Sequence, residues 1–173
     1  MALQPIFAEL EAALHDGIID RYAIGGAVGA TFYIEPSATQ DVDVFVVFNQ
    51  PAQLLVSLAP IYAYFTRRGA VVRDEHLVIA DWPVQFLPAT TPLVDDALAH
   101  AVHMIVEGQP VSVLSQEHLA AIALETGRMK DKIRLAQFLM SETFDRAQFD
   151  TLSERFGLTA QWARFVSLME DQR

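Results

Sequence analysis

The sequence of 173 residues contains no cysteine. A disulfide framework, a Cys-ligated zinc or iron–sulfur site and a thiol nucleophile are therefore excluded. Basic residues are few: Lys and Arg number 12 against 22 Asp and Glu, which gives a formal net charge of −10. So acidic a chain can neutralise little phosphate charge, which argues against non-specific binding to a nucleic-acid backbone. The charge does not exclude a nucleotide, which needs only a local basic group and a metal ion.

Long hydrophobic runs and a secretory signal are also missing. The N-terminus has neither a basic segment nor an unbroken apolar run, so export is not expected. No stretch approaches the ~20 apolar residues of a membrane span. We therefore expect a cytoplasmic protein without membrane attachment. With 52% hydrophobic residues, the chain can form one packed domain, or one domain with a small appendage.

Several catalytic motifs are absent. The chain has no Gly-x₄-Gly-Lys-Ser/Thr loop and no Gly-x-Ser-x-Gly, which argues against a P-loop enzyme and an α/β-hydrolase. The histidines are scattered along the sequence without a His-x₃-His or His-Glu-x₂-His motif; they are His15, His76, His100, His103 and His118. A zinc hydrolase is therefore not expected.

The pattern of apolar residues predicts an α+β fold. Amphipathic spacing predicts helices at 4–15, 51–67 and 93–101, and runs of β-branched and aromatic residues predict strands at 22–24, 41–48, 70–73, 76–80 and 83–87. A hairpin over 103–114 follows, and after Ser115 only helices are expected. Interleaved helices and hairpins favour a small mixed β-sheet flanked by helices. We therefore expect an α/β core over 1–115 and a helical region over 116–173.

The segment 22–48 carries the chemistry. Gly25 and Gly26 follow an apolar strand and open a short helix, where a sharp turn needs residues without a Cβ and where free N–H groups suit phosphate oxygens. Asp41 and Asp43 lie two apart on a strand, so their side chains leave the same face. Two such carboxylates repel unless a cation lies between them, and Mg²⁺ or Mn²⁺ is a cation that takes oxygen ligands. The segment predicts metal-assisted phosphoryl or nucleotidyl transfer.

These residues also carry a family resemblance. Ile24-Gly25-Gly26, then 14 residues, then Asp41-Val42-Asp43-Val44 resembles the signature of the polymerase-β-type nucleotidyltransferase superfamily. Thr39 ahead of the two acids is similar to the minimal nucleotidyltransferases and the abortive-infection toxins of that superfamily. Two later segments resemble a bacterial subgroup of nucleotidyltransferases. Residues 83–88 look like the next core strand of that subgroup, and residues 126–131 look like its Gly-Arg-x-Lys-Asp segment. The resemblance covers roughly residues 20–140.

The resemblance implies a nucleotidyltransferase fold that uses an NTP. It implies two catalytic, metal-binding carboxylates, Asp41 and Asp43, and a nucleotide-binding set of Gly25, Gly26, Thr39, Arg128 and Lys130. The acceptor it implies is a protein hydroxyl, a tRNA end or a small molecule such as an antibiotic. From the residues alone, Thr39 is equally well a turn residue that stabilises Asp41, and residues 128–131 are equally well a charged surface turn.

One position departs from the superfamily pattern. Active members place a third carboxylate on a later core strand, where this chain has Gln85. An amide offers one neutral acceptor oxygen and no charge. Two interpretations stay open: a Mg²⁺-dependent nucleotidyltransferase, and a weakened or inactive relative that binds a nucleotide or a protein partner, as in a toxin–antitoxin pair.

Overall fold

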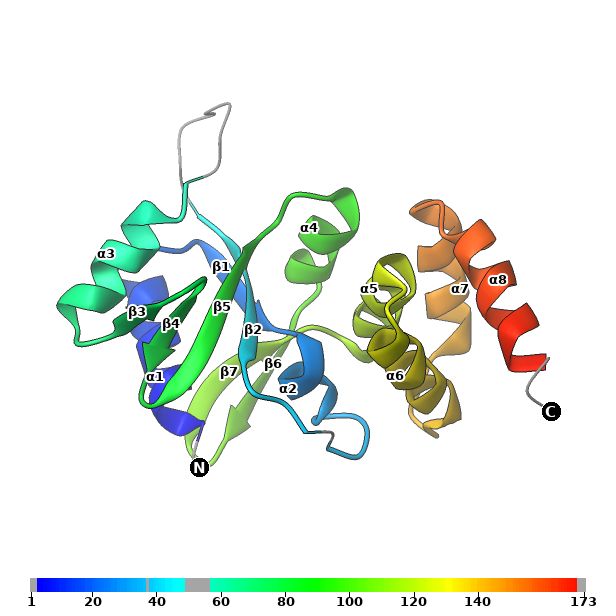
Figure 1. Ribbon diagram of the computed structural model, residues 1–173, viewed down its shortest axis with the longest axis horizontal. Coiled ribbons are helices and arrows are strands. Elements are labelled where there is room, and N and C mark those ends of the chain that lie inside the picture. Colours follow the sequence, from blue (N-terminus) through cyan, green and yellow to red (C-terminus); the bar gives the residue numbers. More distant parts are fainter. Residues whose placement is uncertain (1–2, 37, 49–56, 171–173) are drawn as a thin grey trace.

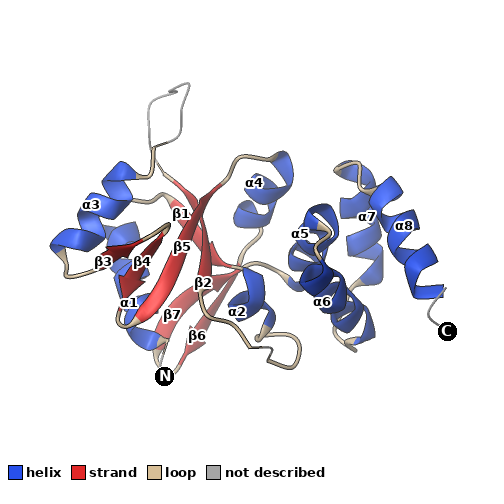
Figure 2. Ribbon diagram, in the orientation of Figure 1, coloured by secondary structure: helices blue, strands red, loops and turns tan. Residues whose placement is uncertain are grey.

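The computed structural model describes residues 3–36, 38–48 and 57–170. Figures 1 and 2 show a twisted sheet with helices on its faces and, beside it, a group of helices formed by the C-terminal part of the chain. This arrangement confirms the expected α+β fold with a mixed sheet flanked by helices and followed by a helical part.

The strands of the described residues form one sheet. They are β1 (Arg21–Ile24), β2 (Val42–Val47), β3 (Val71–Arg73), β4 (His76–Ile79), β5 (Trp82–Pro88), β6 (Val102–Val106) and β7 (Gln109–Val113). Their order is β3-β4-β5-β2-β1-β7-β6. β1 is antiparallel to β2 and parallel to β7, β2 is parallel to β5, and each edge of the sheet is an antiparallel pair. The hairpin predicted over 103–114 is therefore confirmed.

The helices follow the predicted pattern closely. They are α1 (Gln4–His15), α2 (Gly26–Ala30), α3 (Ala59–Arg67), α4 (Pro92–Ala99), α5 (Gln116–Thr126), α6 (Met129–Met140), α7 (Arg146–Arg155) and α8 (Thr159–Glu170). Of the helix predicted at 51–67, residues 51–56 lie outside the described residues, and the prediction is wrong for 57–58, because α3 begins only at Ala59. No helix in the described ranges has the length and hydropathy needed to cross a membrane.

The alternation of side chains along β2 separates two hydrophobic cores. Val42, Val44 and Val46 face one side of the sheet, where they pack with apolar residues of α1 and α3. Phe45 faces the other side and shares a core with α2, α4 and the helices α5–α8. Asp43 has the same parity as Phe45 and therefore points toward the face that carries the C-terminal helices. Because these helices share a core with the sheet, the division at residue 115 stays a prediction.

The turn from β1 into α2 is built against the side chains of β2. The N–H of Gly25 donates to the carbonyl oxygen of Asp43 at 2.9 Å. A Cβ on Gly25 would overlap the ring of Phe45, and a Cβ on Gly26 would overlap the carboxylate of Asp43. Gly26 also has a φ of +56°, which glycine adopts without strain. Both glycines are thus required by side chains that β2 presents.

We expect Gly26→Ala to lower the free energy of unfolding by about 2 kcal/mol more than Gly17→Ala, because only at Gly26 does the new Cβ overlap another side chain. Gly17 is a matched control, since its φ is +69° and nothing lies within 4 Å of the position of its Cβ. Urea unfolding followed by circular dichroism measures both values. Equal losses would show that Asp43 does not pack against Gly26.

Candidate active site

Most residues singled out in the sequence line one cavity of about 810 Å³ between the sheet and helices α5 and α6, hereafter the cleft. They are Gly26, Thr39, Asp41, Asp43, Gln85, Arg128 and Lys130. Gly25 is the exception. It does not line the cleft, and its N–H is already bonded to the carbonyl oxygen of Asp43, so this N–H is not free for a phosphate oxygen.

Thr39 and His76 surround Asp41 at the start of β2. The Thr39 hydroxyl lies 3.0 Å from the carbonyl oxygen of Asp41 and 3.2 Å from its Oδ1. His76 Nε2 lies 3.8 Å from Oδ2 of the same carboxylate. Thr39 therefore makes the turn contact with Asp41 that the sequence left open, and it lines the cleft as well.

The surroundings of Asp43 disfavour the charged form of its carboxyl group. Burial raises the pKa of Asp43, and the negative charge of Asp41 raises it further. The positive charges of Lys130, Arg134 and Arg128 lower this pKa, but only in part. A cation bound beside such a carboxylate stabilises its charged form. The protein itself thus compensates the charge of Asp43 only in part.

Gln85 lies opposite Asp43 in the parallel pair of β2 and β5. Side chains at opposed positions of neighbouring strands leave the same face of the sheet, and both residues line the cleft. The structure therefore brings Gln85 to the side of Asp43, where it offers an amide oxygen in place of a carboxylate.

The opposite wall is basic and comes from the start of α6. Asp131, which is 2% exposed, accepts hydrogen bonds from Arg128 Nε at 2.6 Å and from Arg134 Nη1 at 3.4 Å. Arg134 also lines the cleft, although it was not predicted from the sequence as a site residue. Its position three residues after Asp131 on a helix was the signal for this contact. Among the described residues Lys130 has no ion-pair partner. Lys130 lines the cleft, and its positive charge acts on Asp43.

The remaining lining is largely apolar. It includes Leu87 of β5, Val94 of α4 and Leu119, Ile122 and Ala123 of α5. A molecule in the cleft would thus meet acids from the sheet, cations from α6 and an apolar surface from α5. This combination suits a ligand that has both a charged group and a flat or apolar group.

No protein-family model and no curated protein sequence matches the chain. Solved structures do match. An antigenic nucleotidyltransferase-like protein from Paracoccidioides brasiliensis is similar over 98% of this chain and 89% of that one, with a TM-score of 0.66 and 15% identity. The chain has a nucleotidyltransferase fold. ANT(2'')-Ia in complex with adenylyl-2''-tobramycin is similar over 92% of this chain and 97% of that one, with a TM-score of 0.56 and 16% identity. A solution structure of the antibiotic-resistance factor ANT(2'')-Ia gives a TM-score of 0.53 over 98% and 96% of the two chains at 15% identity.

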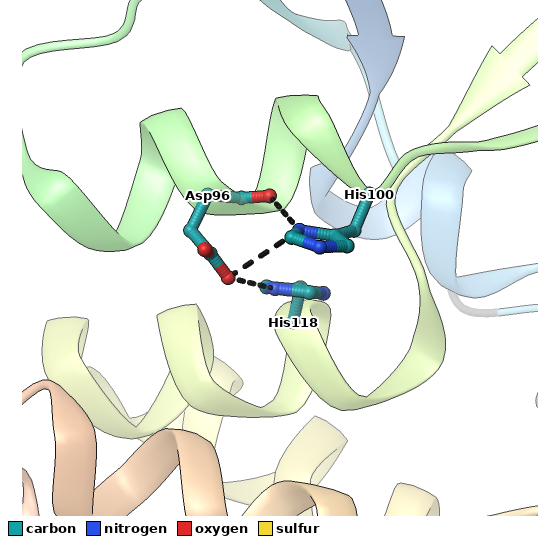
Figure 3. Close-up of side chains that lie close together, drawn as sticks. All are labelled: Asp96, His100 and His118. Carbon is teal, nitrogen blue, oxygen red and sulfur yellow. Dashed lines mark hydrogen bonds and ion pairs between the residues drawn. The ribbon is translucent and has the colours of Figure 1, made fainter.

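The nucleotidyltransferase fold also gathers residues that the sequence leaves far apart. His100 and His118, described above as scattered, meet at Asp96 outside the cleft (Figure 3). Their separation in the sequence therefore does not keep these two histidines apart in the fold. The reason is that α4 and α5 are separated in sequence by the hairpin of β6 and β7 but are packed together in the fold.

The bonds around Asp131 predict a difference between two acidic residues. We expect Asp131→Ala to lower the free energy of unfolding by about 2 kcal/mol, since it leaves the half-buried Arg134 without a partner. Asp150 is the control, because its pair with Arg146 is exposed at both side chains. Its replacement by alanine is expected to cost about 0.5 kcal/mol at most. Chemical denaturation measures both; a loss at Asp131 no larger than at Asp150 would contradict the assignment.

Proposed function

We propose that this protein transfers a nucleotidyl group from an NTP to a hydroxyl group of an acceptor. The observation that carries the proposal is that Asp41, Asp43 and the cations of α6 line one cleft in a nucleotidyltransferase fold. In the reaction the hydroxyl oxygen bonds to the α-phosphorus. The bond from that phosphorus to the bridging oxygen breaks, pyrophosphate leaves with the electron pair, and the hydroxyl proton passes to water.

The carboxylates supply a site that fits Mg²⁺ or Mn²⁺. Mg²⁺ is usually bound by one or two carboxylates together with substrate phosphates, which is what Asp41 and Asp43 offer. The raised pKa of Asp43 supports the same conclusion, because burial beside Asp41 leaves its charge in need of a cation. When bound, one such ion would lower the pKa of the acceptor hydroxyl and a second would neutralise the leaving pyrophosphate.

The other residues of the cleft hold the nucleotide and the acids in place. Thr39 bonds to Asp41 and so orients its carboxylate. Lys130, which has no ion-pair partner among the residues described, neutralises the triphosphate as a point charge. Asp131 holds Arg128 and Arg134 at the same wall, where they add positive charge. Positioning and electrostatics supply most of the catalysis in such a site.

A small molecule is the acceptor that the observations favour over a protein or a tRNA. The net charge of −10 weighs against a tRNA. ANT(2'')-Ia, which is similar over 97% of its own length, was solved with adenylyl-2''-tobramycin, a nucleotidylated small molecule. We therefore propose a hydroxylated small molecule as acceptor and, because NTPs are the donors, the cytoplasm as the location.

Nucleotide binding without transfer is the second candidate function. Gln85 favours it, since the residue opposite Asp43 carries no charge. Gln85 would offer no anionic ligand to an ion that activates the acceptor hydroxyl, whereas Asp41 and Asp43, with the phosphate oxygens, would still hold an ion on the triphosphate. In this case the protein acts by holding a nucleotide or through a protein partner.

Two neighbouring lysines test the basic wall. Lys130→Ala should weaken the binding of Mg²⁺–NTP by about 10- to 100-fold, because it removes one charge-assisted phosphate contact worth roughly 1.5–3 kcal/mol. Lys132 is the matched control, since it lines a different cavity, between α5, α6 and α8. We expect Lys132→Ala to bind like the wild type in isothermal titrations with ATP, CTP, GTP and UTP. Equal effects of both substitutions would show that residues 128–131 form a charged surface turn without a specific role in nucleotide binding.

Gln85 tests transfer itself. The assay follows label from NTPs labelled at the α-phosphate into hydroxylated small molecules, tobramycin among them. We expect slow transfer by the wild type, at least about tenfold faster transfer by Gln85→Asp, which restores a third anionic ligand, and none by Asp43→Asn. Transfer that Gln85→Ala leaves unchanged would mean that another acid completes the site. Nucleotide binding without transfer in both wild type and Gln85→Asp would support the second candidate.

A further inference from the structure

A second group of polar side chains lies at the junction between the sheet and the C-terminal helices. Figure 3 shows Asp96, on the last turn of α4, and His100, directly after that helix, converging on His118 from the first turn of α5. Asp96 Oδ2 lies 3.1 Å from Nε2 of His118 and 3.5 Å from Nδ1 of His100. His118 is 1% exposed, whereas His100 is open to solvent. The group is therefore buried at His118 and open to solvent at His100.

The distances match those between the ligands of one metal ion. With bonds of 2.0–2.2 Å, the ligand atoms of a tetrahedral zinc ion lie about 3.3–3.6 Å apart. Both measured pairs are within a few tenths of an ångström of this range, and the ligand atoms of all three residues lie within 4.8 Å of one another. His100 Nδ1 also lies 2.9 Å from the backbone carbonyl oxygen of Asp96, and a movement of this exposed ring away from that oxygen completes the set.

The surroundings orient these side chains as the neighbours of metal ligands do. His118 Nε2 lies 3.1 Å from Asp96 Oδ2 and donates its proton there; when a cation replaces that proton, Ser115 Oγ, 2.8 Å from Nδ1 of His118, can accept the N–H of Nδ1. Nη1 of Arg155, at the end of α7, lies 3.0 Å from Oδ1 of Asp96. The other carboxylate oxygen, Oδ2, faces the two histidines. The two imidazole rings are stacked, with centroids 5.8 Å apart and planes 13° from parallel.

We propose that Asp96, His100 and His118 bind a divalent transition-metal ion of the zinc type. Two imidazoles and one carboxylate form a donor set that suits zinc, with water as the fourth ligand, whereas Mg²⁺ prefers oxygen alone. The ion joins α4 to α5, and α5 supplies Leu119, Ile122 and Ala123 to the cleft. The site is separate from the cleft and does not rest on the proposed function.

Untagged protein freed of metal with a chelator provides the test. Micromolar Zn²⁺ should raise the melting temperature of the wild type by about 5 °C when Zn²⁺ is about 100-fold above its Kd, and Mg²⁺ should not. Co²⁺ should give the visible absorption of a four-coordinate ion, a readout that does not depend on stability. His100→Ala should lose both effects, because it removes a ligand that is exposed and does not line the cleft.

His15→Ala is the matched control, since His15 is also an exposed histidine at the end of a helix. It should behave like the wild type with both ions. Asp96→Asn should weaken Zn²⁺ binding as well while it keeps the shape of the side chain. A wild type that shows no response to Zn²⁺ or Co²⁺ would overturn the proposal. So would a response that His100→Ala retains in full, because the ion would then be bound elsewhere.

Discussion

The contact between Gly26 and the carboxylate of Asp43 is the constraint on which the rest of the site depends. Asp43 lies where a Cβ of residue 26 would be, so β1 must turn into α2 beside β2. The hydrogen bond from Gly25 to the carbonyl of Asp43 fixes the same approach along the backbone. Strand parity then sends Phe45 into the core shared with the C-terminal helices. Gly25, Gly26, Asp43 and Phe45 are therefore one packed unit.

The cleft is complete only because the helices after residue 115 pack onto this unit. The sheet contributes acids and Gln85, whereas α6 contributes Lys130 and the two arginines held by Asp131. The lysine and arginine side chains of the cleft lining all come from the helical half, and the two acids Asp41 and Asp43 from the sheet half. Asp96 lies between the halves, since it contacts His118 of α5 and Arg155 of α7. Although burial alone would raise it, the hydrogen bond from His118 and the charge of Arg155 lower the pKa of Asp96, which therefore stays ionised at this junction.

Patterns of neighbouring residues predicted the secondary structure and the side of a strand to which a side chain points, because both depend on interactions close in the sequence. The alternation in 41–48 predicted that Asp41 and Asp43 share a face, and helical periodicity found α5 to α8 within a few residues. What the sequence could not indicate depends on packing between distant elements. Examples are the meeting of His100 with His118 and the use of the Gly25 N–H by the backbone of β2. The roles of the site residues remain predictions, since geometry alone does not test them.

Mg²⁺-dependent binding of an NTP tests the central claim, that Asp41 and Asp43 hold a metal–nucleotide complex, most directly. Isothermal titration of the four NTPs with and without Mg²⁺ should give binding at least about tenfold tighter with the ion for the wild type. In the variant with both Asp41→Asn and Asp43→Asn this dependence should disappear. The account would be contradicted if the wild type bound NTPs equally well without Mg²⁺, or if the double variant kept the full dependence.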